Sequence, residues 1–117
     1  MTDSQKLLAE YAKNGSEQAF RELVSRYVNF VYATALRLVN GDTHLAEDVS
    51  QGVFINLARA GRTLSTDVML GGWLHQSTYH LATKAVRSER RRVGREREAV
   101  EMNTLQQADG YGSATRA

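Results

Sequence analysis

The helical character of this chain is clearest in Ala46-Glu47-Asp48-Val49-Ser50-Gln51-Gly52-Val53-Phe54. An apolar stripe recurs there at the three- and four-residue spacing of a helix, on Ala46, Val49, Val53 and Leu57. A second strip mixes an acid, an amide and an aliphatic side chain, on Asp48, Gln51 and Ile55. This mixture on an outer helix face suits a protein partner better than water alone. The segment therefore predicts a helix that packs on one side and docks on another.

The composition favours a small intracellular protein. The chain has 117 residues, no cysteine and no proline. This length allows one domain with a modest core, and the lack of cysteine excludes disulfides and thiolate metal sites. No apolar run is as long as a membrane span, and the N-terminal residues lack a signal-peptide pattern. We therefore expect a cytoplasmic protein that has no membrane partner.

Capping residues divide the chain into about four expected helices. Residues suited to N-caps precede the first three: Asp3 or Ser4, Ser16, and Asp42 or Thr43. Residues suited to helix ends follow them: Asn14-Gly15, Asn40-Gly41 and Gly61. A turn-rich loop is expected from Gly61 to Gly72, before a fourth helix that begins near Trp73. The predicted fold is a compact all-α bundle whose last helix is long and basic.

Charge is concentrated near the C-terminal end of this last helix. Residues 84–98 hold seven basic and three acidic residues, whereas residues 1–83 hold seven basic and eight acidic ones. A basic cluster on a near-neutral body indicates a polyanion partner. The alternative is a solvated helix with internal ion pairs, since Arg92 has helical spacing to both Glu89 and Glu96. The residues beyond Asn103 have a linker composition. We expect a domain over 1–98 and a flexible linker or tail over 99–117.

Catalytic patterns are missing from the sequence. We find no nucleophile–base pair, glycine-rich phosphate loop or paired catalytic carboxylates. His75 and His80 are five residues apart, which is off the spacing that places two imidazoles together on a helix. We therefore expect no enzyme, no metal and no cofactor.

The order of these features resembles region 2 of bacterial RNA polymerase sigma factors, of the extracytoplasmic-function (ECF) type. The matching residues are Gly15 to Val24 with Tyr27 and Val31-Tyr32, then Ala46 to Gln51 with Val53-Phe54 and Leu57, then Trp73-Leu74 and Arg87. The similarity covers roughly residues 4 to 98. It implies a domain of a transcription initiation factor, and nothing here resembles the helix-turn-helix domain (region 4) that usually accompanies region 2.

The resemblance implies that the third helix docks on the clamp helices of the polymerase beta-prime subunit. The implied polymerase-binding residues are Glu47, Asp48, Gln51, Gly52, Ile55 and Ala58. One departure stands out, because the family usually has an acid where this chain has Gly52. Glycine there removes a charged contact and lowers helix propensity by about 1 kcal/mol.

The resemblance also implies that the loop and the fourth helix melt and read the promoter minus-ten element. A flipped base of the nontemplate strand would be captured largely by the loop, where the candidates are Arg62, Thr63, Ser65, Thr66, Asp67 and Met69. Candidates on the helix are His75, Gln76, Tyr79, His80, Thr83 and Lys84. His80 and Lys84 replace the family's usual Asn and Asp, which leaves the base preference open.

Other residues of this region have less specific expected roles. Arginines further along would hold duplex backbone without reading sequence: Arg87, Arg90 and Arg91, followed by Arg92 and Arg95. Trp73 is expected to belong to the core.

Two other interpretations stay open at this point. A polymerase-independent nucleic-acid-binding helical module would account for the basic run but not for the strip of Asp48, Gln51 and Ile55. An anti-sigma factor is a further partner that the resemblance allows, because such factors commonly hold family members inactive.

Overall fold

A computed structural model describes residues 2–65 and 67–116, with side chains as far as Gln107. The chain divides into two compact units, Met1–Val86 and Arg87–Ala117, and each is described by itself. Over the described residues, every regular element is helical: α1 (Asp3–Asn14), α2 (Glu17–Leu38), α3 (Thr43–Ala60) and α4 (Leu70–Arg116). The prediction of an all-α fold is confirmed.

Polar caps start the first three helices. Thr2 caps α1 in a capping box with Gln5, so the predicted cap at Asp3 or Ser4 was displaced by one residue or more. Ser16 accepts a hydrogen bond from the Ala19 amide and caps α2, as predicted. Asp42 accepts one from the Leu45 amide at 3.1 Å and caps α3, which was one of the two predicted caps. Each cap satisfies an amide that the helix itself leaves unbonded.

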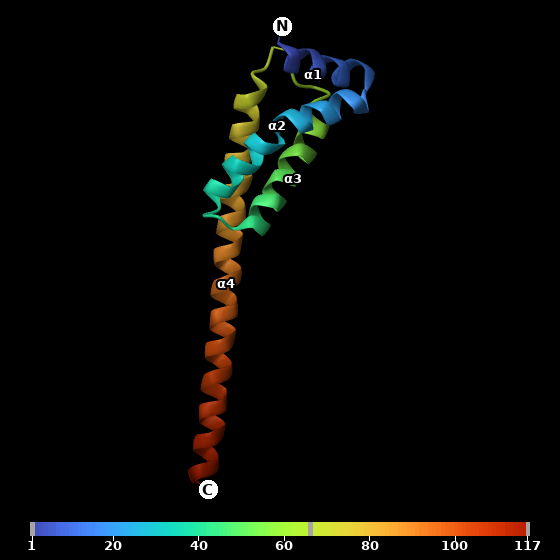
Figure 1. Ribbon diagram of the computed structural model, residues 1–117. Helices are drawn as coiled ribbons and strands as arrows, with labels where there is room; N and C mark the ends of the chain where they lie inside the picture. Colours follow the sequence, from blue (N-terminus) through green and yellow to red (C-terminus); the bar gives the residue numbers. More distant parts are fainter. Residues whose placement is uncertain (1, 66, 117) are drawn as a thin grey trace. The chain divides into compact units, whose positions relative to one another are not determined.

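Residues with a left-handed backbone conformation follow α1 and α2. Gly15 follows α1 with φ +63°, and Asn40 and Gly41 follow α2 with φ +59° and +83°. These residue types tolerate the left-handed region best, which is why the chain reverses at these two points. As a result α2 and α3 run antiparallel and side by side (Figure 1).

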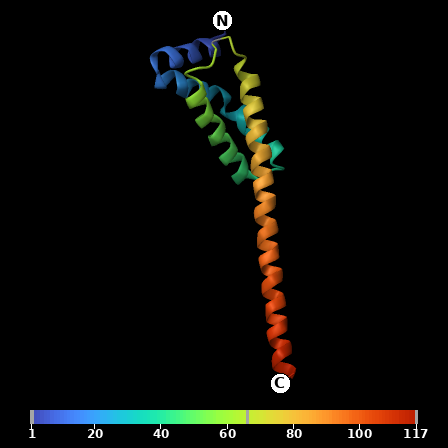
Figure 2. The same cartoon turned by 180° about the vertical axis from the view of Figure 1, so that it is seen from behind.

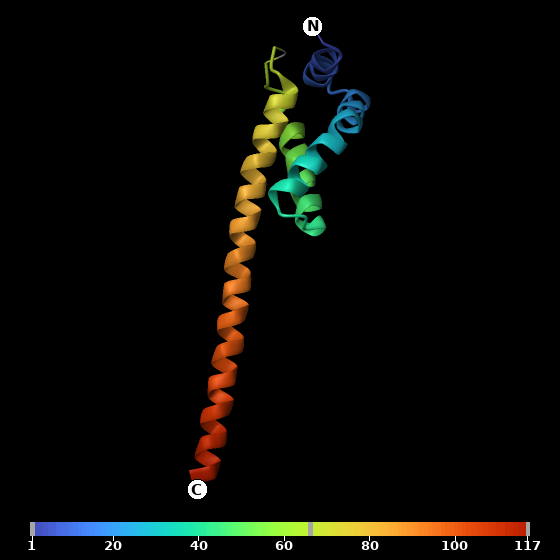
Figure 3. The same cartoon turned by 60° about the vertical axis from the view of Figure 1, so that its left-hand side comes forward.

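The core of the first unit is aliphatic and draws on all four helices. The predicted stripe of α3 is buried throughout, on Ala46, Val49, Val53 and Leu57. It packs with Leu8 of α1, Leu23 and Val31 of α2, and Leu74 and Ala82 of α4. Figures 2 and 3 show the first part of α4 beside α2 and α3. Trp73 is half-buried against this core, which agrees with the role expected for it.

Both ends of α4 differ from the prediction. The helix begins at Leu70 instead of near Trp73, because Leu70 is buried in the core and fixes the first turn there. It continues to Arg116, which is beyond the expected domain end at residue 98. The flexible tail over residues 99–117 stays a prediction. Residues 99–107 contain alanine, glutamate, methionine, leucine and glutamine, which favour helix, and the chain has no proline to stop it.

Candidate functional site

The outer strip of α3 is exposed as the sequence predicted. Glu47, Asp48 and Gln51 are exposed, and Ile55 keeps 52% of its surface accessible. Ala58 lies half-buried one turn further along. The strip therefore presents a carboxylate, an amide and an apolar side chain on one accessible side of the helix.

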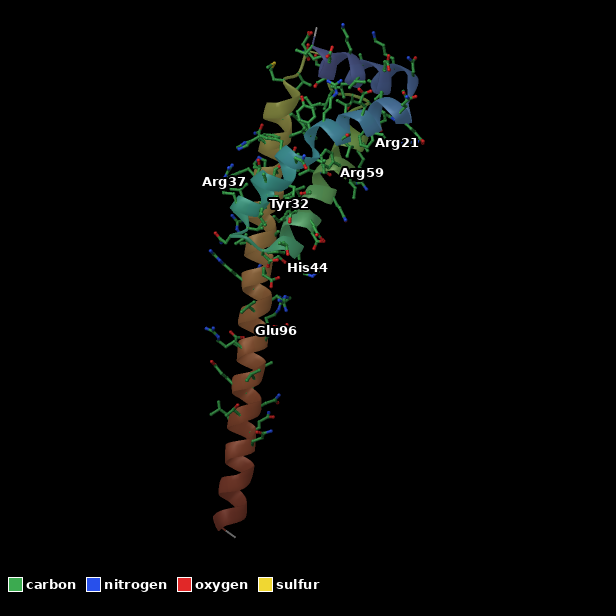
Figure 4. The ribbon with its side chains drawn as sticks, viewed as in Figure 1. Arg21, Tyr32, Arg37, His44, Arg59 and Glu96 are labelled. Atoms are coloured by element: carbon green, nitrogen blue, oxygen red, sulfur yellow. The ribbon has the colours of Figure 1, made fainter. Side chains whose placement is uncertain are left out.

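An apolar groove runs along this strip between α2 and α3. The groove has a volume of about 570 Å³ and is lined by Phe20, Val24 and Val28 of α2 and by Ser50, Gln51, Phe54, Ile55 and Ala58 of α3. Unlike charges lie at the two ends of its α3 side, since the exposed Asp48 precedes the lining residues of α3 and the exposed Arg59 follows them (Figure 4 labels Arg59). An amphipathic helix could lay an apolar face in such a groove and pair its polar residues with the rims.

Gly52 does not share this surface. It is half-buried, and a Cβ atom built on it would come within 3.2 Å of the Leu81 Cδ1 atom of α4. Gly52 therefore lies against α4, while its neighbour Gln51 lies along the groove. The absent side chain allows the two helices to approach closely at this turn.

The loop between α3 and α4 is anchored at both ends. Leu64 and Val68 are half-buried against the core, and Gly61 is buried beneath the Tyr11 ring. The predicted DNA contacts Arg62, Thr63, Ser65, Asp67 and Met69 are exposed, and Met69 keeps 73% of its surface accessible. Thr66 lies outside the residues that the structure describes.

Internal bonds hold several of these loop residues. Arg62 lies over the Tyr11 ring, with its guanidinium carbon 5.9 Å from the ring centroid. The Ser65 hydroxyl accepts a hydrogen bond from the Asp67 amide at 3.2 Å, and the Thr63 hydroxyl donates one to the Ala60 carbonyl. The loop therefore has a defined turn while most of its polar side chains face solvent.

The predicted DNA-facing residues of α4 lie together on one side of the helix. His75, Gln76, Tyr79, His80 and Lys84 are exposed, while Thr83 is half-buried and donates its hydroxyl to the Tyr79 carbonyl at 2.8 Å. The inner side holds Leu74, Thr78 and Ala82, which are buried. Phe30 of α2, which the sequence did not single out, lies beside this face with its ring centroid 6.4 Å from that of His75.

The arginines of the second unit differ in how they are paired. Arg92 bonds both Glu89 and Glu96, and these carboxylates raise the pKa of Arg92 above its ordinary value, mainly through the hydrogen bond and charge of Glu89. Figure 4 shows Glu96 on this part of α4. Among the described residues, no ion pair involves Arg87, Arg90, Arg91 or Arg95. These four are exposed cations and can meet phosphates.

A comparison with known protein families shows to which family the chain belongs. The family model of Sigma-70 region 2 matches residues 23–92, which is more than half of the sequence. The chain belongs to the sigma-70 region 2 family. No curated protein and no solved structure matches the chain significantly.

The sigma region 2 match covers every residue predicted to bind polymerase or DNA except Arg95. Domains of this family are non-enzymatic parts of transcription initiation factors that bind RNA polymerase and contribute to promoter recognition. No helix in the described part of this sigma domain has the length and hydropathy of a membrane span. Over the same residues, no group of three or more His, Cys, Asp or Glu side chains could hold a metal.

Sequence reasoning missed the α2 wall of the groove in this sigma domain. Phe20 and Val24 are half-buried and line the groove, and Phe20 also packs against the core. Apolar residues recur along α2 from Phe20 to Leu38 on a stripe wider than one neighbouring helix can cover, and this width was the available signal.

Proposed function

We propose that this sigma region 2 domain is of the ECF type and docks on the beta-prime clamp helices of core RNA polymerase. The observation that carries the proposal is the exposed strip of Asp48, Gln51 and Ile55 beside the α2/α3 groove, within the family match. The clamp helices form a coiled coil, and a helix with an apolar edge and a cationic residue would complement this surface. Glu47 and Ala58 flank the strip and extend the proposed contact.

We also propose that the loop between α3 and α4, together with α4, opens and reads the promoter minus-ten element. A flipped base of the nontemplate strand would be held near the exposed loop residues, and Gln76, Tyr79 and His80 would read or stack on the bases that follow. Arg87, Arg90 and Arg91 would bind backbone phosphates. Residues 1–98 would form the working domain and residues 99–117 a tail, and an anti-sigma factor would be the regulator.

Polymerase binding is tested by one charge reversal and its matched control. Asp48→Arg should weaken binding of the chain to core RNA polymerase by tenfold or more, because it places like charges in contact. Glu10→Arg makes the same charge change on an exposed position of α1 and should leave binding unaltered. Equal binding by the wild type and Asp48→Arg would contradict docking through α3. If the wild type itself fails to bind core polymerase, a polymerase-independent nucleic-acid module becomes the better explanation.

A further inference from the structure

A second cavity adjoins the apolar groove near the N-terminal end of α2. It has a volume of about 290 Å³ and lies among the end of α1, the start of α2 and the loop that follows α3. Its lining residues are Tyr11, Gly15, Glu17, Phe20, Arg21 and Arg62. Phe20 lines the apolar groove as well, so the two hollows share one wall. A protein segment seated in the groove would therefore reach this cavity where it passes Phe20.

Aromatic rings and a fixed arginine shape this cavity. The rings of Tyr11 and Phe20 have their centroids 5.0 Å apart and supply its apolar part. The guanidinium carbon of Arg62 lies over Tyr11, and its Nη2 atom is 3.9 Å from the place that a Cβ atom on Gly15 would take. Arg62 is thus held beside the C-terminal end of α1, where the helix carbonyls favour a cation.

The positive charge of the cavity is only partly balanced by the protein itself. Arg21 pairs with Glu17 at 3.7 Å, but the two side chains are 79% and 85% exposed, and an ion pair so open to water is weak. Among the described residues, Arg62 takes part in no ion pair. Two guanidinium groups and one carboxylate leave one positive charge for a ligand. A further carboxylate suits this site, because it accepts paired hydrogen bonds from a guanidinium.

The groove itself runs from an acidic end to a basic end. Glu47 and Asp48 are exposed just before the first lining residue of α3. Beyond the opposite end lie the two arginines of the cavity and also the exposed Arg59 (Figure 4 labels Arg21 and Arg59). A bound segment therefore meets opposite charges at its two ends, which favours one direction of binding over the reverse.

These features suit a protein segment better than DNA. The lining residues of α3 run from Ser50 to Ala58, which is about 12 Å or two turns of helix. A helix with apolar side chains could fill this length and place an acidic side chain past Phe20, in the cavity. A DNA strand has no aliphatic side chains for the groove, and its phosphates would meet the carboxylate of Glu17.

We infer that the cavity of Arg21 and Arg62 binds a carboxylate side chain of the protein segment that occupies the groove. The inference rests on the proposed function and deepens it, because it gives the docking segment of core RNA polymerase a second charged contact. It also gives that segment a direction, with a cationic residue beside Asp48 and an acidic residue about two turns further along.

Titrations with core RNA polymerase test the inference. Arg21→Glu and Arg62→Glu should each weaken polymerase binding about tenfold, because each places a carboxylate against the carboxylate of the partner. Arg37→Glu makes the same charge change on an exposed position of α2 that lines neither hollow, and it should leave binding unaltered. Unchanged helical circular dichroism of the variants excludes misfolding.

A cross-link identifies the partner group directly. Arg62→Lys keeps the charge and adds an amine, which a carbodiimide should join to an aspartate or glutamate of one polymerase subunit, as mass spectrometry would show. Absence of this cross-link from a variant that still binds polymerase would overturn the inference.

Other outcomes separate the cavity from the groove and from DNA. Full polymerase binding by Arg21→Glu and Arg62→Glu, with weakened binding by Asp48→Arg, would overturn the carboxylate site and leave the proposed function intact. Weaker binding of Arg21→Glu to duplex DNA, with polymerase binding unaltered, would overturn it in favour of a phosphate site. No binding of core polymerase by the wild type would overturn both proposals.

Discussion

The hydroxyl of Tyr11 in α1 donates a hydrogen bond to the carbonyl of Ala58 near the end of α3, at 2.6 Å. The ring of the same tyrosine covers Gly61 and lies under the Arg62 guanidinium. α1 lies outside the residues that match the family, yet Tyr11 fixes the point where α3 ends and the loop begins. One side chain therefore connects the N-terminal helix to the start of the loop between α3 and α4.

Removal of this hydroxyl should destabilise the first unit. Tyr11→Phe keeps the ring but leaves the Ala58 carbonyl without this donor, so the free energy of unfolding should fall by about 1 kcal/mol. Urea denaturation followed by circular dichroism measures the change. Tyr32→Phe is the control, because Tyr32 is half-buried and its hydroxyl makes no hydrogen bond with the described residues (Figure 4 labels Tyr32). Equal losses in the two variants would show that the Tyr11 bond contributes nothing of its own.

Two glycines near the loop should respond oppositely to alanine. A Cβ atom at Gly61 would come within 2.7 Å of the Leu57 carbonyl oxygen and 3.1 Å of the Tyr11 ring. Gly61→Ala should therefore lower the free energy of unfolding by about 1–3 kcal/mol. Gly72 in the first turn of α4 has nothing within 4 Å, so Gly72→Ala should raise it by about 0.5–1 kcal/mol. Thermal melts of the two variants give the signs, and a stable Gly61→Ala protein would mean that the Tyr11 ring moves freely.

The close approach of α3 to α4 at Gly52 should appear as coupling between two positions. Gly52→Leu forces a side chain against Leu81 and should destabilise the first unit by about 1–3 kcal/mol. In a Leu81→Ala background the new side chain finds room, so the same substitution should cost less by about 1 kcal/mol or more. A double-mutant cycle in urea measures the difference, and strictly additive effects would argue against the contact.

Salt dependence should reveal the unpaired arginines of the second unit. Removal of both Arg90 and Arg91 should reduce the slope of log affinity for duplex DNA against log salt by about two, since we expect each of them to contact one phosphate. Lys6→Ala with Lys13→Ala removes two exposed cations from α1 and should leave the slope unaltered. If the two double variants behave alike, only net charge matters and the arginines have no specific contact.

Local sequence signals predicted the helices of the first unit well. Ser16 and Asp42 cap α2 and α3, and the aliphatic stripe of α3 is buried as its spacing predicted. These features depend on neighbours within a few residues, which the sequence displays directly. The tail was harder to predict, because its polar composition suits both a linker and a solvated helix.

The site was harder to predict, because it depends on which helix covers which face. Periodicity shows that Gly52 and Gln51 lie on different sides of α3, but not that Gly52 meets Leu81 of α4. Phe20 and Phe30 are apolar residues of one helix, so pattern alone assigns both to the core. Only the packing of α2 against its neighbours reveals that Phe20 lines a groove and Phe30 borders the face of α4.

The contact between Gly52 and Leu81 has a mechanical consequence. At that turn a single leucine side chain separates the backbone of α3 from α4, so little compressible material lies between the two helices. We therefore expect a small shift of α3 at this turn to displace the adjoining part of α4 as well. The side chains of His75 and His80 belong to that part of α4, so their positions should respond to a change at Gln51.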